Sequence, residues 1–281
     1  MSAARRDSVQ SVERAFDLVE ALADGDDLGV TELAERTGLV PSTAHRLLAT
    51  LAKRGYATRS PTSGGYVLGY KVVELANGLE DSLARLRGVA RPHLESVQRE
   101  TGESANLTIL DGDRVVYVDQ VEGSRRMRMF TTVGAAVLAH TTASGKAILA
   151  HGQPDSLTEL YSEDGELERL TPRTLTTVGA LRKDLERIER QGYAVDNEEH
   201  EEGVSCVAAP IFDHTGRPCA AISISAPTAR IVQAEIDEVG KLLHEHAAKV
   251  SAGLGHGSGE GAKGDGGGAR SRKPGSSRKR S

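Results

Sequence analysis

The stretch VTELAERTGLVPSTAHRLLATLAKRGY, residues 30–56, decides the fold of the first part of this chain. Its first half predicts a short helix in which Thr31 caps the start and Gly38 supplies the left-handed residue that ends the helix. Pro41 begins a second helix, because proline fits the first helical position, and Gly55 ends it. An inward stripe recurs there at helical spacing: Ala44, Leu47, Leu48 and Leu51. Two short helices joined by a tight turn predict a helix-turn-helix.

The charges around this motif are unevenly distributed. Residues 1–35 carry three basic and nine acidic side chains, whereas residues 36–71 carry six Lys or Arg and no Asp or Glu. Such a block favours a polyanionic partner over a merely solvated face. The stretch YATRSPTSGGYVLG, residues 56–69, then predicts two short strands around a Gly64–Gly65 turn. A first helix over residues 11–24 and this hairpin complete a winged helix-turn-helix.

Double-stranded DNA is the partner that this surface predicts, because hydroxyls and arginines on the exposed helix face reach phosphates and base edges in the major groove. The predicted contacts are Arg36, Ser42, Thr43, His45, Arg46, Thr50, Lys53 and, in the wing, Arg59. A three-helix domain that binds protein is the alternative, but it offers no reason to exclude carboxylates from this helix and wing. Aromatic residues are 3% of the chain and tryptophan is absent, which disfavours stacking on single-stranded RNA.

The bulk composition bounds the class of protein. A length of 281 residues allows two domains. No apolar run reaches about 18 residues and the N-terminus has no signal-peptide core, so a soluble cytoplasmic protein without a membrane partner is expected. Cys206 and Cys219 make no disulfide framework, and no CxxC or HxxxH pair offers a zinc ligand set. We expect reduced thiols, no metal and no cofactor.

Beyond the wing, helical and alternating patterns follow one another. Helical periodicity predicts a stalk helix and four later helices, over residues 71–90, 93–104, 143–152, 180–192 and 236–251. Alternation predicts strands in three places: a hairpin over residues 104–123 with an Asp111–Gly112 turn, a short strand near 127–130, and a pair over 205–226. This order predicts an α+β protein whose second domain is built around an antiparallel sheet.

The predicted boundaries follow from these elements. They are a DNA-binding domain over residues 1–70, a linker helix over 71–90, a second domain over 91–252, and a basic Gly/Ser-rich tail over 253–281. From Gly255 the tail carries seven Lys or Arg against two acids and almost no apolar side chain, so disorder is predicted. Additional DNA affinity and a solubilising end are its two alternative roles.

Residues 195–213, VDNEEHEEGVSCVAAPIFD, place five carboxylates around one histidine ahead of an apolar strand. Because these acids follow a helix end and precede a strand, an exposed loop is predicted, with a hard-cation site as the alternative. Cys206 stands at the start of the strand. It is there either an inert buried thiol or, in an enzyme, a nucleophile paired with His200 or His214, and the inert thiol is favoured.

The stretch TTASGKAIL, residues 141–149, contains Gly-Lys before a helix but is not a phosphate loop. No glycine stands five residues before Gly145, and Ala147 occupies the position where Ser or Thr would hold magnesium. Ser144 and Gly145 lie at a helix start. Backbone N–H groups there either attract a small carboxylate or are capped in the ordinary way.

Several stretches occur in order along about residues 8–250: SVERAFDLVEAL, VTELAERTGLVPSTAHRLLATLAKRGY, YVLGYKVVELA, TASGKAIL, LTPRTLTT, GYAVDNEEHEEGVSCVAAPIFD and AAISISAPTAR. Together they resemble the IclR family of bacterial transcriptional regulators. The resemblance implies a GAF-like domain that senses a small metabolite, in a homodimer or a dimer of dimers that binds a promoter palindrome. It also implies a ligand-responsive repressor, with an activator as the alternative, and not an enzyme.

The resemblance further implies a set of effector-binding residues. In relatives that bind glyoxylate or pyruvate, two backbone amides at the helix start, an Asp, a Cys and two Ser form the pocket. Carried over, these fall on Ser144, Gly145, Asp196, Cys206, Ser223 and Ser225. The two serines alternate on one face of a strand, as lining side chains must. An apolar wall is expected from Met127, Phe130, Leu138 and Val204.

The nature of the effector depends on Asp196. Its carboxylate would repel an anion unless it is protonated or accepts a hydrogen bond from the ligand. A small organic acid that carries a hydroxyl, hydrated aldehyde or ureido donor avoids this conflict. Glyoxylate or a ureido acid such as allantoate is therefore the expected effector, with glycerol metabolites as the alternative.

Overall fold

The structure is a computed structural model that describes residues 9–23, 27–126, 131–152, 156–162, 165–231 and 233–257. The chain divides into two compact units, Met1–Ala84 and Arg85–Ser281, and the division falls inside the predicted linker helix. Separate clusters of buried apolar side chains lie in the two units. The predicted α+β class, with a winged helix-turn-helix followed by an antiparallel sheet, is confirmed.

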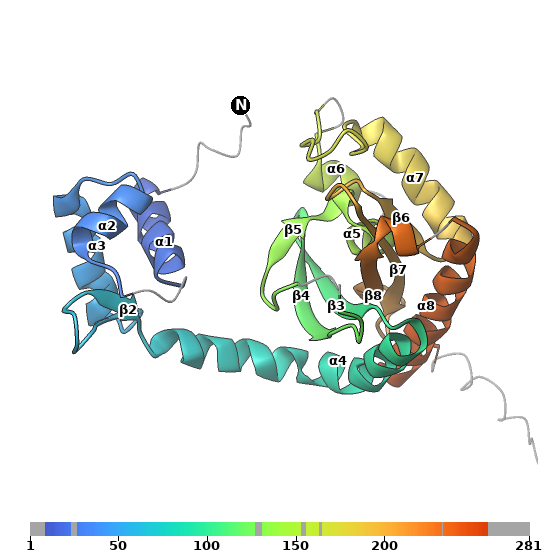
Figure 1. Cartoon of the computed structure of the whole chain (residues 1–281), viewed down its shortest axis with the longest axis horizontal. Coiled ribbons are helices and arrows are strands. Elements are labelled where there is room, and N and C mark those ends of the chain that lie inside the picture. Colours follow the sequence, from blue (N-terminus) through green and yellow to red (C-terminus); the bar gives the residue numbers. More distant parts are fainter. Residues whose placement is uncertain are drawn as a thin grey trace, which may run out of the picture. The chain divides into compact units, whose positions relative to one another are not determined.

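The first unit is a winged helix-turn-helix (Figure 1). Its elements are α1 (Gln10–Ala23), α2 (Val30–Arg36), α3 (Pro41–Lys53) and the antiparallel strands β1 (Ala57–Arg59) and β2 (Tyr66–Leu68). Fully buried leucines from all three helices form its core: Leu18, Leu22, Leu33 and Leu48. Gly38 and Gly64 have φ angles of 64° and 76°, at the predicted helix stop and wing turn. The predicted Thr31 cap is wrong, because α2 starts at Val30 and its N-cap is Gly29, two residues earlier.

Helix α4 (Lys71–Thr101) is continuous, although a stalk and a separate second helix are predicted there. Pro92 lies inside it and removes one backbone hydrogen bond. Ala90, Leu94 and Val97 repeat at helical spacing around the proline and are fully buried. Burying Leu94 and Val97 contributes about 1.5–3 kcal/mol each, which offsets the cost of about 3 kcal/mol for an interior proline.

The second unit is built on a six-stranded antiparallel sheet with the order β5-β4-β3-β8-β7-β6. Its strands are β3 (Ser104–Asp111), β4 (Arg114–Val121), β5 (Ala136–Leu138), β6 (Ala194–Asn197), β7 (Val204–Phe212) and β8 (Pro218–Pro227). Its further helices are α5 (Ala143–Leu149), α6 (Ser156–Leu160), α7 (Val178–Gln191) and α8 (Gln233–Gly253), with 3-10 turns at Ala139–Thr141 and Thr228–Arg230. Figure 1 shows the strands curling around the labelled α5.

The two faces of the sheet have different covers. Ala208 of β7 and Ala221 of β8 pack in one core with α5 and α7. Ile224 points to the opposite face, because strand side chains alternate, and it borders a groove with Val239 and Leu242 of α8. The β8 positions on the α5 face therefore run Ala221, Ser223, Ser225, which brings two hydroxyls to one side of the sheet.

Several predicted elements have a clear outcome. The hairpin over residues 104–123 is confirmed, with Asp111 paired to Arg114 across its turn. Three elements are not predicted at all, namely α6, β5 and β6. The strand expected near residues 127–130, with Met127 and Phe130 of the expected apolar wall, lies outside the described residues, as does the tail from residue 258. Within the described part of the chain, no helix combines the length and apolarity needed to cross a membrane.

Candidate functional site

Four neighbouring strands direct polar side chains to the α5 face of the sheet. The backbone register pairs Asp196 of β6 with Cys206 of β7, and Cys206 with Ser225 of β8. Ser223 lies two residues before Ser225 and pairs with Asn106 of β3. Cross-strand partners lie about 4.5–5.5 Å apart, so these groups form a continuous polar surface rather than isolated sites.

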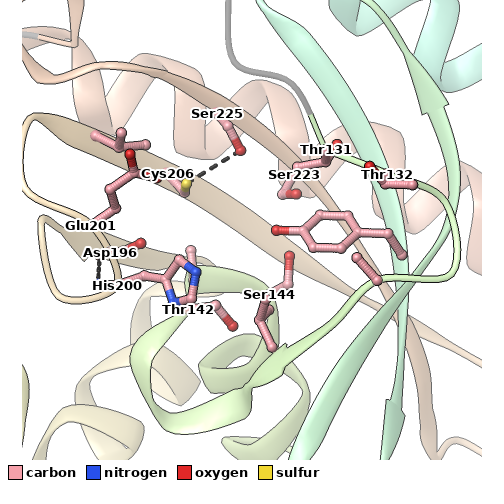
Figure 2. A pocket seen from close by; sticks show the side chains of 15 residues that line it. Thr131, Thr132, Thr142, Ser144, Asp196, His200, Glu201, Cys206, Ser223 and Ser225 are labelled. Carbon is pink, nitrogen blue, oxygen red and sulfur yellow. Dashed lines mark hydrogen bonds between the residues drawn. The ribbon is translucent and has the colours of Figure 1, made fainter. Parts of the chain in front are cut away.

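This polar surface forms the floor of a cavity of about 270 Å³ (Figure 2). Strands β4 and β7, the start of α5 and the turn after β6 supply the walls. The lining residues are Tyr117, Thr131, Thr132, Ala135, Val137, Thr142, Ala143, Ser144, Asp196, His200, Glu201, Val204, Cys206, Ser223 and Ser225. Five of the six predicted effector residues are thus brought together. Of the predicted apolar wall, Val204 lines the cavity, and the place of Leu138 is taken by its neighbour Val137.

Ser225 is the centre of the hydrogen bonds on the cavity floor. The Cys206 thiol donates to Ser225 Oγ at 3.2 Å, a bond visible in Figure 2, and Asn106 Nδ2 donates to the same oxygen at 3.3 Å. Thr131 Oγ1 in turn donates to Asn106 Oδ1 at 2.9 Å. Because Ser225 Oγ accepts twice, its own hydroxyl hydrogen is left to donate to a ligand. No local sequence pattern indicates Asn106, since its role depends on its place beside β8.

Asp196 is 1% exposed, although the sequence predicts that it lies in an exposed loop. Its Oδ1 accepts the backbone N–H groups of Glu199 at 2.7 Å and His200 at 3.4 Å, which fixes the turn that follows β6. Burial raises the pKa of Asp196 to about 7, against the lowering effect of the Glu199 N–H group and of Lys146. The carboxyl group is therefore close to half protonated at neutral pH.

Burial, aided by the nearby Asp196, also raises the pKa of the Cys206 thiol above its usual value. A nucleophilic cysteine requires the opposite, a thiolate stabilised at neutral pH. Burial raises the pKa of the Tyr117 phenol in the same way. Both groups are neutral hydrogen-bonding partners, and the enzyme alternative loses its nucleophile.

A buried ion network lies under the acidic turn. Lys146 of α5 is 0% exposed, and its Nζ donates to Glu199 Oε1 at 2.6 Å and to Asp184 Oδ2 at 3.0 Å. Arg187 Nε donates to Asp184 Oδ1 at 3.0 Å from the outer side. The loop prediction is therefore wrong for Glu199, which is 9% exposed, and holds for the exposed Glu201 and Glu202. Glu199 is buried because it pairs with Lys146, which lies 53 positions earlier in the chain.

The same turn is held from a second side by the LTPRTLTT stretch. Thr171 Oγ1 donates to the Glu198 carbonyl at 2.7 Å, and Thr174 Oγ1 donates to the Glu199 carbonyl at 2.6 Å. Glu198 has a φ of 62°, which is uncommon for a residue with a side chain. The turn is thus fixed by a lysine and two threonines. Among the described residues, no three His, Cys, Asp or Glu side chains are arranged to hold a metal ion.

The N-terminus of α5 differs from the prediction at one position. The Gly145 N–H donates to Thr142 Oγ1 at 3.1 Å, so it takes part in ordinary helix capping, and Gly145 is not among the lining residues. A Cβ atom at Gly145 would lie 2.2 Å from the Ala139 carbonyl oxygen. Glycine is required here for close packing, while Ser144 lines the cavity.

The predicted DNA-binding face is accessible in the first unit. All of its residues are exposed except Thr43, which is half-buried. Arg59 is held in the wing, because its Nη1 donates to the Gly64 carbonyl at 2.8 Å and its guanidinium lies 4.6 Å from the centre of the Tyr66 ring. No acidic residue occurs in the first turn of α3. The surface is therefore suited to a negatively charged partner.

Comparison with known proteins gives a consistent result over both units. The family model for the IclR helix-turn-helix domain matches residues 11–61, and the model described as bacterial transcriptional regulator IclR C-terminal matches residues 82–252. The HTH-type transcriptional regulator BhcR of Paracoccus denitrificans is 38% identical over 249 residues, which are 88% of each chain. The transcriptional repressor IclR of Escherichia coli is 34% identical over 250 residues, 88% of this chain and 90% of the repressor.

Solved structures show the same likeness. A crystal structure of an IclR homologue from Microbacterium hydrocarbonoxydans, complexed with 4-hydroxybenzoate, superposes with a TM-score of 0.71 at 28% identity. It covers 87% of this chain and 98% of that chain.

Proposed function

This chain belongs to the IclR family of bacterial transcriptional regulators, and from that premise we propose that it is a repressor whose affinity for operator DNA changes when a small organic acid binds in the second unit. In this proposal residues 1–70 bind DNA, residues 71–90 connect, and residues 91–252 bind the effector. Its relatives and matching family models are transcriptional regulators, and the chain is accordingly a regulator and not an enzyme. The E. coli relative named as a repressor supports repression over activation.

The observation that carries the effector proposal is the convergence of Ser144, Asp196, Cys206, Ser223 and Ser225 on one cavity. Its volume of about 270 Å³ is slightly below the range of common ligand pockets, about 300 to 1,000 Å³, which favours a small ligand. A small ligand with oxygen atoms at both ends matches this volume and the polar groups of the lining. Glyoxylate or allantoate remains our proposed effector, with a glycerol metabolite second. The structure of the homologue with 4-hydroxybenzoate supports an acid that also carries a hydroxyl group.

The DNA-binding part of the proposal rests on α3 and the wing. The N-terminal turns of α3 present Ser42, His45 and Arg46, which would contact base edges, while Thr43, Thr50 and Lys53 would contact phosphates. Arg59 would contact the backbone from the wing, and Arg36 from the end of α2. Arg46 is the residue best suited to a bidentate contact with guanine.

A homodimer, or a dimer of dimers, is the proposed assembly. Val9, Val12 and Phe16 are 61%, 50% and 57% exposed on and just before α1, at the spacing of one helix face. An exposed apolar stripe of this kind marks an association surface. A twofold dimer would place two winged helices on the two halves of a palindrome. Effector and DNA would then influence one another reciprocally through the continuous α4.

The test is a fluorescence-anisotropy titration of the protein on DNA from directly upstream of its own gene, with and without glyoxylate, allantoate, pyruvate and glycerol 3-phosphate. We expect specific binding that one compound shifts, and we expect Ser223→Ala and Cys206→Ala to abolish the shift while retaining DNA binding. Cys219→Ala is the matched control, because Cys219 bonds the Ile211 carbonyl outside this cavity. Absence of specific binding at low salt would contradict the proposed function itself.

A further inference from the structure

The charges around the cavity do not match an acid effector in a simple way. Its described lining residues include two carboxyl groups, Asp196 and Glu201, and no lysine or arginine. The remaining polar lining is made mostly of hydroxyl groups. A carboxylate that enters meets donors without a compensating positive charge, and it lies near a buried acid.

The cations of the buried network under the acidic turn are already engaged. Lys146 lies under the turn but is bonded to Glu199 and Asp184, and Arg187 pairs with Asp184 from outside. Two cations thus balance two carboxylates within this network. Among the described residues Asp196 has no ion-pair partner, and a second negative charge beside it would be strongly disfavoured at this burial.

Asp196 itself can carry a proton without losing its structural role. Oδ1 accepts the two backbone N–H groups that hold the turn. A proton on the other oxygen, Oδ2, leaves those bonds in place and converts the group into a donor. Burial raises the pKa of Asp196 to about 7, so this protonation requires little free energy near neutral pH.

We propose that an acid effector enters this cavity together with one proton, which is taken from solvent and held by Asp196. The protonated carboxyl donates a hydrogen bond to an effector oxygen, beside the hydroxyl groups of Ser223 and Ser225. This inference rests on the proposed function and deepens it, because it makes the regulator respond jointly to the acid and to pH. Operator release, or operator binding, would then require more effector in alkaline conditions.

Three other titratable groups near Asp196 are neutral between neutral and mildly alkaline pH. Burial lowers the pKa of His200, whose Nδ1 is hydrogen bonded to Thr141 Oγ1 at 3.0 Å, so the ring is neutral. Burial raises the pKa of both Cys206 and Tyr117, so both keep their protons. Burial raises the pKa of Glu199, which Lys146 holds in an ion pair from α5, and Glu201 is exposed on the turn. The Asp196→Asn variant therefore decides whether a pH dependence in this range belongs to Asp196.

The test is isothermal titration calorimetry of the full chain with glyoxylate, pyruvate and allantoate, which stay ionised across the range. Above about pH 7 the Kd should rise about tenfold per pH unit, hence about 100-fold between about pH 6 and about pH 9. Repeating the titration in buffers of different ionisation enthalpy should show the uptake of about one proton at the alkaline end.

Asp196→Asn is the diagnostic variant, because its amide oxygen can accept the same two N–H groups and its amide nitrogen can donate as the protonated acid does. It should bind with the low-pH affinity of the unmodified protein and with a flat pH profile. Glu201→Gln removes a carboxylate from the same cavity and should keep the slope of the unmodified protein.

Three outcomes would contradict the uptake of a proton by Asp196. Binding with a flat pH profile and no proton uptake in the unmodified protein would overturn the proposal and leave the effector site intact, and this measurement requires no variant. A slope that persists in Asp196→Asn would overturn it by assigning the proton to another group. If none of the three acids binds at any pH, this inference falls together with the acid-effector proposal.

Discussion

Replacing Lys146 by methionine tests the buried ion network most directly. Methionine keeps most of the length and volume of the lysine side chain but removes its charge. Lys146 is fully buried and bridges Glu199 and Asp184. Asp184 keeps its contact with Arg187 in the variant, whereas the 9%-exposed Glu199 loses its cation. The variant therefore contains one uncompensated buried carboxylate.

The expected cost follows from that uncompensated charge. Breaking a buried ion pair by removing one partner destabilises a protein by about 3–5 kcal/mol, and the remaining Asp184–Arg187 pair points to the lower end. Removing both charges in Lys146→Met/Glu199→Gln should restore most of this loss, because no buried charge remains. Lys183→Met, at an exposed position of α7, should stay within about 0.5 kcal/mol.

The loss of stability in Lys146→Met should also depend on pH. Burial raises the pKa of Glu199, and Lys146 counteracts this effect. Without Lys146 the folded-state pKa rises further above the unfolded value, so the folded variant binds a proton that the unfolded chain releases. Stability then falls as pH rises through that interval, and the difference from the unmodified protein should be smaller at acidic than at neutral pH.

The assay is urea unfolding followed by circular dichroism, with attention to the transition of the second unit. A loss below about 1 kcal/mol in Lys146→Met would refute the reasoning, since surface substitutions commonly cost as little. A double variant no more stable than Lys146→Met would refute it equally, because the cost would then come from packing and not from charge.

Four further changes have expected outcomes. Arg46→Ala should weaken operator binding in anisotropy titrations by about 1–3 kcal/mol, and an unchanged affinity would remove Arg46 from the DNA contacts. Phe16→Glu should shift sedimentation toward a smaller species if the exposed α1 stripe is the association surface, and an unchanged profile would exclude it. Gly145→Ala places a Cβ 2.2 Å from the Ala139 carbonyl oxygen and should lower stability in urea by about 1–3 kcal/mol, so a neutral result would contradict the packing argument. Asp196→Asn should be more stable than the unmodified protein above about pH 7. The raised pKa of Asp196 makes its ionisation unfavourable in the folded state, so the unmodified protein loses stability as pH rises through that pKa. Equal stability of the two proteins at alkaline pH would show that the ionised carboxylate is well accommodated.

Local sequence patterns predict the structure correctly wherever a residue's environment depends on its near neighbours in the chain. The apolar spacing of residues 30–56 predicts α2 and α3, and Gly38 and Gly64 mark stops that the structure confirms by their positive φ angles. The Asp111–Gly112 signal predicts the β3–β4 hairpin, although the observed two-residue loop is Gly112–Asp113, because Asp111 pairs with Arg114. The alternation of Ser223 and Ser225 predicts that both lie on one face of the sheet, and both line the cavity. Helical and strand periods act over a few residues, so they can be recognised without a partner segment.

Other features depend on residues that are distant in sequence. The acidic run from Asp196 to Glu202 has the composition of an exposed loop, yet Asp196 and Glu199 are buried because Lys146 and two backbone N–H groups compensate them. Strand β6 is not predicted for the same reason, since the four residues AVDN carry little strand signal and become a strand only through pairing with β7. Sequence patterns alone therefore determined the winged helix and the main strands, and the family resemblance named five of the residues that line the cavity. Only the tertiary structure decided which acids are buried, which cation holds them and where a proton can be stored, because the energy of a buried charge depends on its surroundings in space and not on its neighbours in the chain.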